Sequence, residues 1–186
     1  MVVALVALLM TFIPPSSADD NIQSANTLIE GVSASGQVCY DDGCSPTDEV
    51  DWWKVNAYKG DIVSISFSGN LPNPSLVCIW GDGWEGDFSI HDASGGQIAS
   101  LALSDDNPSG TLSKTMNSAD FVYVKIKGKD SWCNDAIDYT LTASIDSNDR
   151  DTDEDGYIDT EDSCDNTPGT SVYDRKGCID SDSDGY

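Results

Sequence analysis

The stretch Asp61-Ile-Val-Ser-Ile-Ser-Phe-Ser68 alternates apolar and serine side chains. Successive side chains of an extended chain point to opposite sides, so Val63, Ile65 and Phe67 share one face and the serines share the other. An apolar face of this kind must be covered by a second layer of structure. The stretch therefore predicts a strand with one buried and one solvated face, as in an antiparallel sheet.

Two later stretches repeat this alternation. Val122, Val124 and Ile126 form one apolar face, and the segment from Asp138 to Ile145 places a second set inward, namely Tyr139, Leu141, Ala143 and Ile145. Residues rich in glycine and proline separate such segments, and no long helical period appears between positions 36 and 145. About 110 residues suffice for two packed sheets around one core. We expect an all-β fold, an antiparallel β-sandwich.

The charge is strongly negative, with 33 acidic against nine basic side chains and a formal net charge of −24. Such a chain repels phosphates, so a nucleic acid or an anionic membrane is excluded as the general partner, and cations are favoured. Residues 146 to 186 alone contain 14 acidic and three basic side chains, a net of −11. We interpret them as a tail that is physically separate from the sandwich.

Within the tail, Asp151-Thr-Asp-Glu-Asp-Gly-Tyr-Ile-Asp-Thr-Glu-Asp162 has the spacing of a calcium loop. A glycine at position 6 permits the sharp turn, and oxygen ligands alternate around it. The pattern restarts at Asp180. The candidate ligands are Asp151, Asp153, Asp155, the carbonyl of Tyr157, Asp159, Asp162, Asp180, Asp182 and Asp184.

Two other interpretations of the acidic run fit its sequence less well. A disordered acidic linker has this composition, but it has no reason to keep and repeat the ligand spacing. An EF-hand or a dockerin needs a helix on each side of the loop, whereas a predicted strand ends at Ile145 and Pro168-Gly169 prevents an exit helix.

The N-terminus is typical of an exported protein. Residues 1–14 are almost wholly apolar and too short to span a bilayer, and Ser16-Ser17-Ala18 supplies small residues at a cleavage position. We expect a signal peptide over residues 1–18, a secreted or cell-surface location, and no membrane span in the mature chain.

An exported chain with six cysteines is expected to carry three disulfides, although 15 pairings are possible. Proximity along the chain favours Cys39–Cys44, Cys78–Cys133 and Cys164–Cys178. With no C-x-x-C pair and a single histidine, His91, a zinc site is a poor competitor.

Catalytic motifs are missing from the sequence: it has no G-x-S-x-G elbow, no H-E-x-x-H helix and no phosphate loop. We therefore expect no enzyme in these residues. Trp80 and Trp84 lie in a glycine-rich loop, where they are expected either to contact polysaccharide or to pack within the loop.

Three landmarks resemble the pre-peptidase C-terminal domain of secreted microbial proteins. They are Asp51-Trp-Trp-Lys-Val55 leading to Lys59-Gly-Asp61, Ile90-His-Asp-Ala-Ser-Gly95, and Tyr139-Thr-Leu141. The resemblance spans roughly residues 24 to 146. It implies a jelly-roll-like β-sandwich of the kind appended to secreted enzymes or surface proteins, sometimes with a carbohydrate-binding or matrix-binding role.

The tail resembles thrombospondin type-3 repeats. The resemblance rests on D-x-D-x-D-G-x-x-D-x-x-D-x-C from Asp151 to Cys164, on Gly177-Cys178 and on the restart at Asp180, while Asp165 stands where many prokaryotic copies have proline. It implies calcium ions wrapped by an irregular chain, with a disulfide between successive turns.

Together these features predict three segments: a signal peptide over residues 1–18, a sandwich over 19–146, and a calcium-bound, disulfide-tied repeat region over 147–186. The function expected is a structural or adhesive calcium-binding protein whose partners are calcium and a polysaccharide or a cell-surface or matrix protein. The alternative is a polysaccharide-binding or accessory domain of a larger exported hydrolase or peptidase.

Overall fold

A computed structural model describes residues 21–39, 49–70, 85–104, 106–129, 136–173 and 175–185. Several predictions fall outside these residues: the signal peptide at 1–18, Trp80 and Trp84, and the pair Cys78–Cys133. Cys39 is buried and disulfide-bonded, but its expected partner Cys44 also lies outside the described part.

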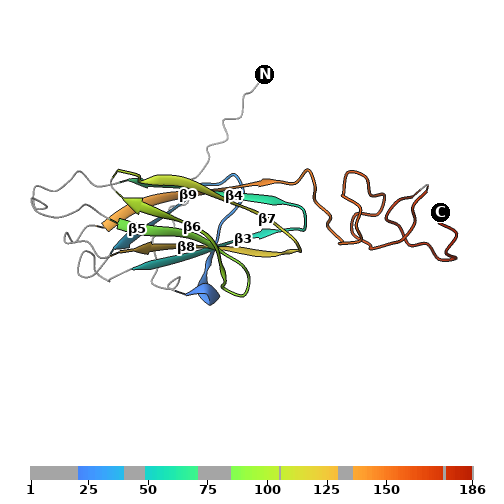
Figure 1. The fold of residues 1–186 in the computed structure, drawn as a ribbon, viewed down its shortest axis with the longest axis horizontal. Helices are drawn as coiled ribbons and strands as arrows, with labels where there is room; N and C mark the ends of the chain where they lie inside the picture. Colours follow the sequence, from blue (N-terminus) through green and yellow to red (C-terminus); the bar gives the residue numbers. More distant parts are fainter. Residues whose placement is uncertain are drawn as a thin grey trace, which may run out of the picture.

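Two sheets make up the sandwich (Figure 1). The five-stranded sheet has the order β1-β3-β8-β5-β6, formed by Asn26–Thr27, Val50–Ala57, Asp120–Gly128, Glu85–His91 and Gln97–Ser104. The four-stranded sheet has the order β2-β9-β4-β7, formed by Ala34–Cys39, Ala136–Asp146, Ile62–Asn70 and Ser109–Thr115. A single 3-10 turn, η1 at Ile22–Ser24, precedes β1.

Strands β2 to β9 follow a jelly-roll path. Consecutive strands change sheet at each step except for the hairpin of β5 and β6, and every pairing among them is antiparallel. Only the short β1 runs parallel to its neighbour β3. The expected all-β, jelly-roll-like sandwich is confirmed.

The core lies between the sheets and is built by the predicted alternation. Val63, Ile65 and Phe67 of β4 are buried, and Ser64 and Ser66 instead hydrogen-bond Ser113 and Thr111 of β7 on the outer side. Inward-facing residues of β9 and β8 complete this layer: Tyr139, Leu141, Ala143, Val122, Val124 and Ile126. Burial of this apolar surface is the main stabilising term of the fold.

Two landmark motifs of the sequence meet inside this core. Tyr139 of β9 donates a hydrogen bond to the buried carboxylate of Asp51, and its hydroxyl oxygen accepts one from Trp53 Nε1 at 2.8 Å. Gly36 lies beneath this hydroxyl, where a Cβ would be only 2.3 Å from it. The D-W-x-x-V and Y-T-L motifs are therefore two ends of one polar network that links the sheets.

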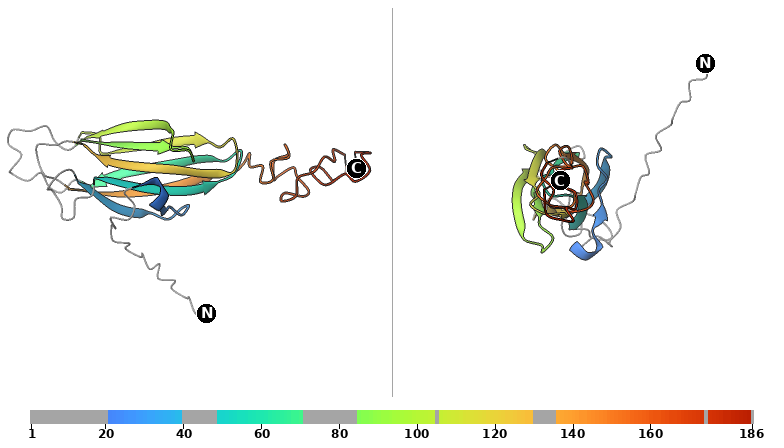
Figure 2. Two further views of the ribbon diagram at one scale, coloured as in Figure 1. Left: turned by 90° about the horizontal axis from the view of Figure 1, so that it is seen from below. Right: turned by 90° about the vertical axis from the view of Figure 1, so that its right-hand side faces the viewer.

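The tail begins where β9 ends at Asp146 and continues along the long axis of the sandwich (Figures 1 and 2). From residue 147 onward the described chain contains neither helix nor strand. Cys164 and Cys178 form the predicted disulfide. Only Asp151, Ser171, Gly177 and Cys178 of the described tail are buried, so this segment has almost no apolar core. Among the described residues, no helix is long and apolar enough to cross a membrane.

Candidate metal centre

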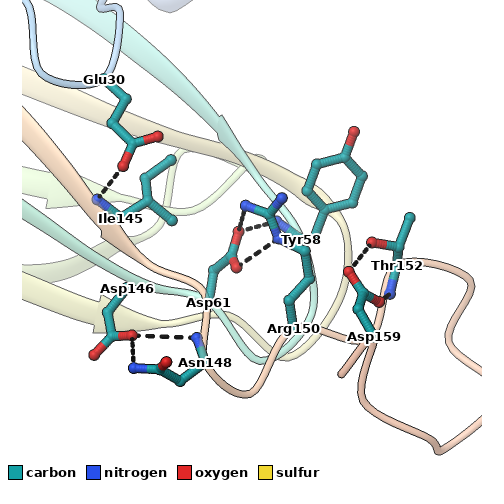
Figure 3. A network of polar contacts seen from close by, with 9 residues as sticks. All are labelled: Glu30, Tyr58, Asp61, Ile145, Asp146, Asn148, Arg150, Thr152 and Asp159. Atoms are coloured by element: carbon teal, nitrogen blue, oxygen red, sulfur yellow. Dashed lines mark hydrogen bonds and ion pairs between the residues drawn. The ribbon is translucent and has the colours of Figure 1, made fainter. Parts of the chain in front are cut away.

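The tail is attached to the sandwich by the turn between β3 and β4, which contains the Lys59-Gly-Asp61 landmark. Asp61 is fully buried and accepts two hydrogen bonds from Arg150, from Nε at 2.9 Å and from a terminal guanidinium nitrogen at 3.0 Å (Figure 3). The backbone amide of Tyr58 donates a third at 2.8 Å. The hydrogen bond with Asp61 raises the pKa of Arg150, whose guanidinium also lies 4.7 Å from the Tyr58 ring centroid.

Gly60 and Lys59 complete this joint. Gly60 has φ +85°, and a Cβ there would lie 1.7 Å from the carbonyl oxygen of Asp149, so the tail backbone passes directly over the glycine. The amide of Asp151 donates to the Lys59 carbonyl at 2.9 Å, and Lys59 Nζ donates to Asp151 Oδ2 at 2.6 Å. The first candidate metal ligand is therefore positioned by the sandwich itself.

The first loop is held by its own carboxylates. Asp151 Oδ2 accepts from the amide of Gly156 at 3.2 Å, Asp153 Oδ1 accepts from the amide of Asp155 at 3.3 Å, and Asp155 Oδ1 accepts from the amide of Tyr157 at 2.9 Å. These three aspartates each place one oxygen within 4.8 Å of the others. The hydrogen bond to Asp155 thus fixes the amide of Tyr157, whereas coordination of a metal by the Tyr157 carbonyl stays a prediction.

The second loop repeats the conformation of the first. The amide of Gly185 donates to Asp180 Oδ2 at 2.8 Å, which matches the bond from Gly156 to Asp151. Positive φ occurs at the fourth and sixth positions of both loops, at Glu154 and Gly156 and again at Ser183 and Gly185. Asp180, Asp182 and Asp184 converge as the first three aspartates do. The sequence restart at Asp180 is therefore also a structural repeat.

The remaining candidate ligands connect the loop to the following chain. Asp159 holds Thr152 through both carboxylate oxygens, at 2.8 Å to the amide and 2.7 Å to the hydroxyl (Figure 3). Asp162 Oδ1 accepts from the amide of Cys164 at 2.7 Å, and Asp155 Oδ2 accepts from the amide of Gly169 at 3.1 Å. Asp159 therefore braces the loop, whereas Asp155 and Asp162 join it to the segment that the disulfide closes.

In the described part of the tail, three buried carboxylate oxygens have no hydrogen-bond partner: Asp151 Oδ1, Asp153 Oδ2 and Asp162 Oδ2. Burial is the main cause that raises the pKa of Asp153, and the negative charges of Asp155 and Asp162 add to it. A buried oxygen without a partner costs about 1–3 kcal/mol, and more when it is charged. The donor set contains only carboxylate oxygens at close range, which fits a hard cation such as Ca²⁺.

Three residues at the joint were not predicted from the sequence: Lys59, Asp61 and Arg150. The available signal was local, because Arg150 is the only basic residue between Lys129 and Arg175 and stands directly before the acidic loop. His91 is buried in a hydrogen-bonded pair with Ser89, at 2.9 Å between Nε2 and Oγ, while its Nδ1 lies 3.1 Å from the carbonyl oxygen of Gly95.

No family model and no curated protein matches this chain. Among solved structures, the pre-peptidase C-terminal domain of a collagenase from Bacillus anthracis is 15% identical, with a TM-score of 0.42 over 64% of this chain and 94% of that one. The copper-binding surface protein CorA of Methylomicrobium album BG8 is 10% identical, with a TM-score of 0.46 over 66% and 98%. A periplasmic inhibitor of g-type lysozyme from Aeromonas hydrophila is also 10% identical, with a TM-score of 0.34 over 66% and 97%. These likenesses concern the β-sandwich alone and carry no argument about ligand or activity.

Proposed function

We propose that this chain is a non-enzymatic, secreted or cell-surface calcium-binding protein in which a β-sandwich interaction module is joined to a stalk of thrombospondin type-3-like repeats. The observation that carries the proposal is the set of three buried, unpartnered oxygens on Asp151, Asp153 and Asp162. Their mutual repulsion and lost hydration disfavour the loop unless a cation offsets both.

Calcium is the cation that the donor set favours. Ca²⁺ takes six to eight oxygen ligands in flexible geometry, and an irregular loop with alternating aspartates provides such ligands. The first loop would hold it through Asp151, Asp153, Asp155 and Asp162 together with the Tyr157 carbonyl, and the second through Asp180, Asp182 and Asp184. An ion bound with a dissociation constant of about 10⁻⁴ M stabilises the folded segment by roughly 2.7 kcal/mol at 100-fold excess.

A structural role is favoured over a switching role. The tail buries almost no apolar surface, so ions and the Cys164–Cys178 disulfide take the place of a core. Closing a loop of about 15 residues contributes on the order of 3 kcal/mol through the unfolded state. Within the described residues, no helix flanks the first loop on either side, whereas an EF-hand opens through two such helices.

The joint to the sandwich supports a stalk with a fixed direction. Asp151 is held by Lys59, the neighbouring Arg150 is held by Asp61, and the amide of Ala119 donates to Glu154 Oε1 at 2.8 Å. Three separate contacts therefore restrain the first loop against the end of the sandwich. The alternative is a polysaccharide-binding domain, or an accessory domain of a larger exported hydrolase or peptidase. If polysaccharide binds through Trp80 and Trp84, replacing both tryptophans by alanine should abolish glycan binding.

Calorimetric titration of the full chain with calcium tests the proposal. We expect saturable uptake at or below millimolar concentrations, and a loss of affinity of about tenfold or more in the variant Asp153→Asn/Asp162→Asn. The matched control is Asp149→Asn/Asp165→Asn, which removes two exposed carboxylates from the same segment and is expected to leave the affinity nearly unchanged. The absence of uptake at millimolar calcium, or equal losses in the two variants, would contradict the proposal.

A further inference from the structure

The outer face of the five-stranded sheet differs in chemistry from the rest of this acidic protein. Because side chains alternate along a strand, the residues between the buried positions of β3 and β8 point away from the core. They bring together three aromatic rings and two lysines, here called the lysine–aromatic face: Trp52, Lys54, Phe121, Tyr123 and Lys125. No motif in the sequence predicts this grouping, because its members come from strands about 70 residues apart.

The strand register places the rings and the lysines in an alternating arrangement. Trp52 is opposite Lys125, and Lys54 is opposite Tyr123. Lys125 Nζ lies 5.2 Å from the centroid of the Trp52 ring, and Lys54 Nζ lies 5.5 Å from that of Phe121. Each ammonium group is thus held beside an aromatic surface by a cation–π contact.

Neither lysine of this face takes part in an ion pair of the described residues. The described ion pairs use four of the other cations, Lys59, Lys129, Arg150 and Lys176, but none of them includes Lys54 or Lys125. Lys127 follows Lys125 on the same side of β8 and is exposed. Lys114 on β7 and Arg175 in the tail are also outside the described ion pairs, but only on this face do three such lysines, Lys54, Lys125 and Lys127, share one side of neighbouring strands. In a chain of formal charge −24, this grouping offers positive charge to an anionic partner.

The aromatic rings are partly covered by neighbouring side chains. Trp52 and Tyr123 are half-buried, and Phe121 is 38% exposed. The ring centroid of His91 lies 5.0 Å from that of Trp52, and His91 is held in turn by hydrogen bonds with the Ser89 hydroxyl and with the carbonyl oxygen of Gly95. At the edge of this face, Ile22 Cδ1 of η1 lies 3.6 Å from the point where a Cβ added at Gly95 would be. Flat, supported rings suit a ring-shaped ligand better than insertion into a bilayer, which requires protruding apolar groups.

We propose that the lysine–aromatic face binds an anionic polysaccharide. The apolar side of a pyranose ring would pack on Trp52, and the carboxylate or sulfate of the same or a neighbouring sugar would accept charge-assisted hydrogen bonds from Lys125 and Lys54. Asn56 at the end of β3 and Ser100 on β6 flank the face with exposed neutral groups for sugar hydroxyls. This inference concerns the sandwich alone and does not depend on calcium binding by the tail.

The proposal is tested by measuring the dissociation constant of the full chain for three polymers: hyaluronate for carboxylates, dextran sulfate for sulfates, and neutral dextran. Calcium is kept constant throughout. We expect one or both anionic polymers to bind and dextran not to bind, with an affinity that falls as salt rises. Lys54→Gln/Lys125→Gln should weaken binding about five- to thirtyfold, since two exposed pairs of up to about 1 kcal/mol each are lost.

The control variant, Lys114→Gln/Lys176→Gln, removes the same charge from β7 and the tail and is expected to bind as the unmodified chain does. Trp52→Leu should weaken binding of the anionic polymer without changing its salt dependence, because it removes the ring and no charge. Equal losses in the two lysine variants, equal binding of dextran, or no binding of either anionic polymer would overturn the proposal. Near-ultraviolet circular dichroism confirms that each variant is folded.

Discussion

Replacing Arg150 by methionine provides a direct test of how the tail is attached to the sandwich. The substitution keeps an apolar stem against Tyr58 but removes the partner of a fully buried carboxylate, since Asp61 has 0% exposure. Asp61 would retain only the hydrogen bond from the Tyr58 amide. Removing one partner of a buried ion pair costs about 3–5 kcal/mol because the other charge stays buried and uncompensated.

The structure indicates the lower end of this range. The Arg150 side chain is 27% exposed, so water can reach the position that the guanidinium leaves, and we expect a loss of about 3 kcal/mol in the free energy of unfolding. The double variant Asp61→Asn/Arg150→Met should recover a large part of this loss, since the amide introduced at position 61 would be neutral and could still accept from Tyr58.

Urea denaturation of the full chain, followed by tryptophan fluorescence at constant calcium, measures this loss. Lys176→Met is the matched control, because its 3.7 Å pair with Glu161 is exposed on both sides and should contribute less than about 0.5 kcal/mol. A loss below about 1 kcal/mol for Arg150→Met, or no recovery in the double variant, would refute the argument that a buried pair fixes the joint.

Three further predictions concern the sandwich and its turns. Gly60→Ala should destabilise the chain by clearly more than Gly31→Ala in the same denaturation assay. Both glycines have positive φ, which costs about 1–2 kcal/mol for a residue with a Cβ, but only at Gly60 would that Cβ meet backbone, 1.7 Å from the carbonyl oxygen of Asp149. Similar losses in the two variants would contradict the close approach of the tail to Gly60. Tyr139→Phe should lower the free energy of unfolding by about 2–4 kcal/mol, because the buried Trp53 N–H and the Asp51 carboxylate both lose the tyrosine hydroxyl. The control Ser66→Ala removes an exposed hydrogen bond and should lower it by only about 0.5 kcal/mol. A loss for Tyr139→Phe as small as that of the control would argue against the buried network. The pKa of Asp92 is lowered mainly by the hydrogen bond from the Ser94 hydroxyl and next by that from the Gly96 amide. The stability that ionised Asp92 contributes should therefore be present above the ordinary aspartate pKa of about 3.9 and disappear as pH falls through the lowered value. An NMR titration in which Ser94→Ala leaves the Asp92 pKa unchanged would disprove this cause.

The sequence alone predicted the elements whose pattern is local. Alternation in β4, β8 and β9 indicated both the strands and their buried faces, since period two directly reports a half-covered sheet. The close spacing of Cys164 and Cys178 likewise favoured the disulfide that forms. The two aspartate loops were identified from ligand spacing, and their shared positive φ positions follow from the same repeated sequence.

What the sequence could not predict depends on contacts between distant residues. Asn107-Pro-Ser-Gly110 has the composition of a turn, but Ser109 and Gly110 already belong to β7, where the absence of a side chain at Gly110 leaves room for Leu101 of β6. The pairing of Asp61 with Arg150 joins positions 89 residues apart. The lysine–aromatic face likewise arises only when the register sets β3 beside β8.

Amide hydrogen exchange of the full chain, with calcium and with a chelator, tests most directly the claim that calcium orders the tail. We expect the amides of Gly156, Gly169 and Gly185, which donate to aspartates of the two loops, to be protected from exchange in calcium and to lose this protection when calcium is chelated. Amides of the central strand β9 should be equally protected in both conditions. Equal protection of the loop amides with and without calcium would contradict the account.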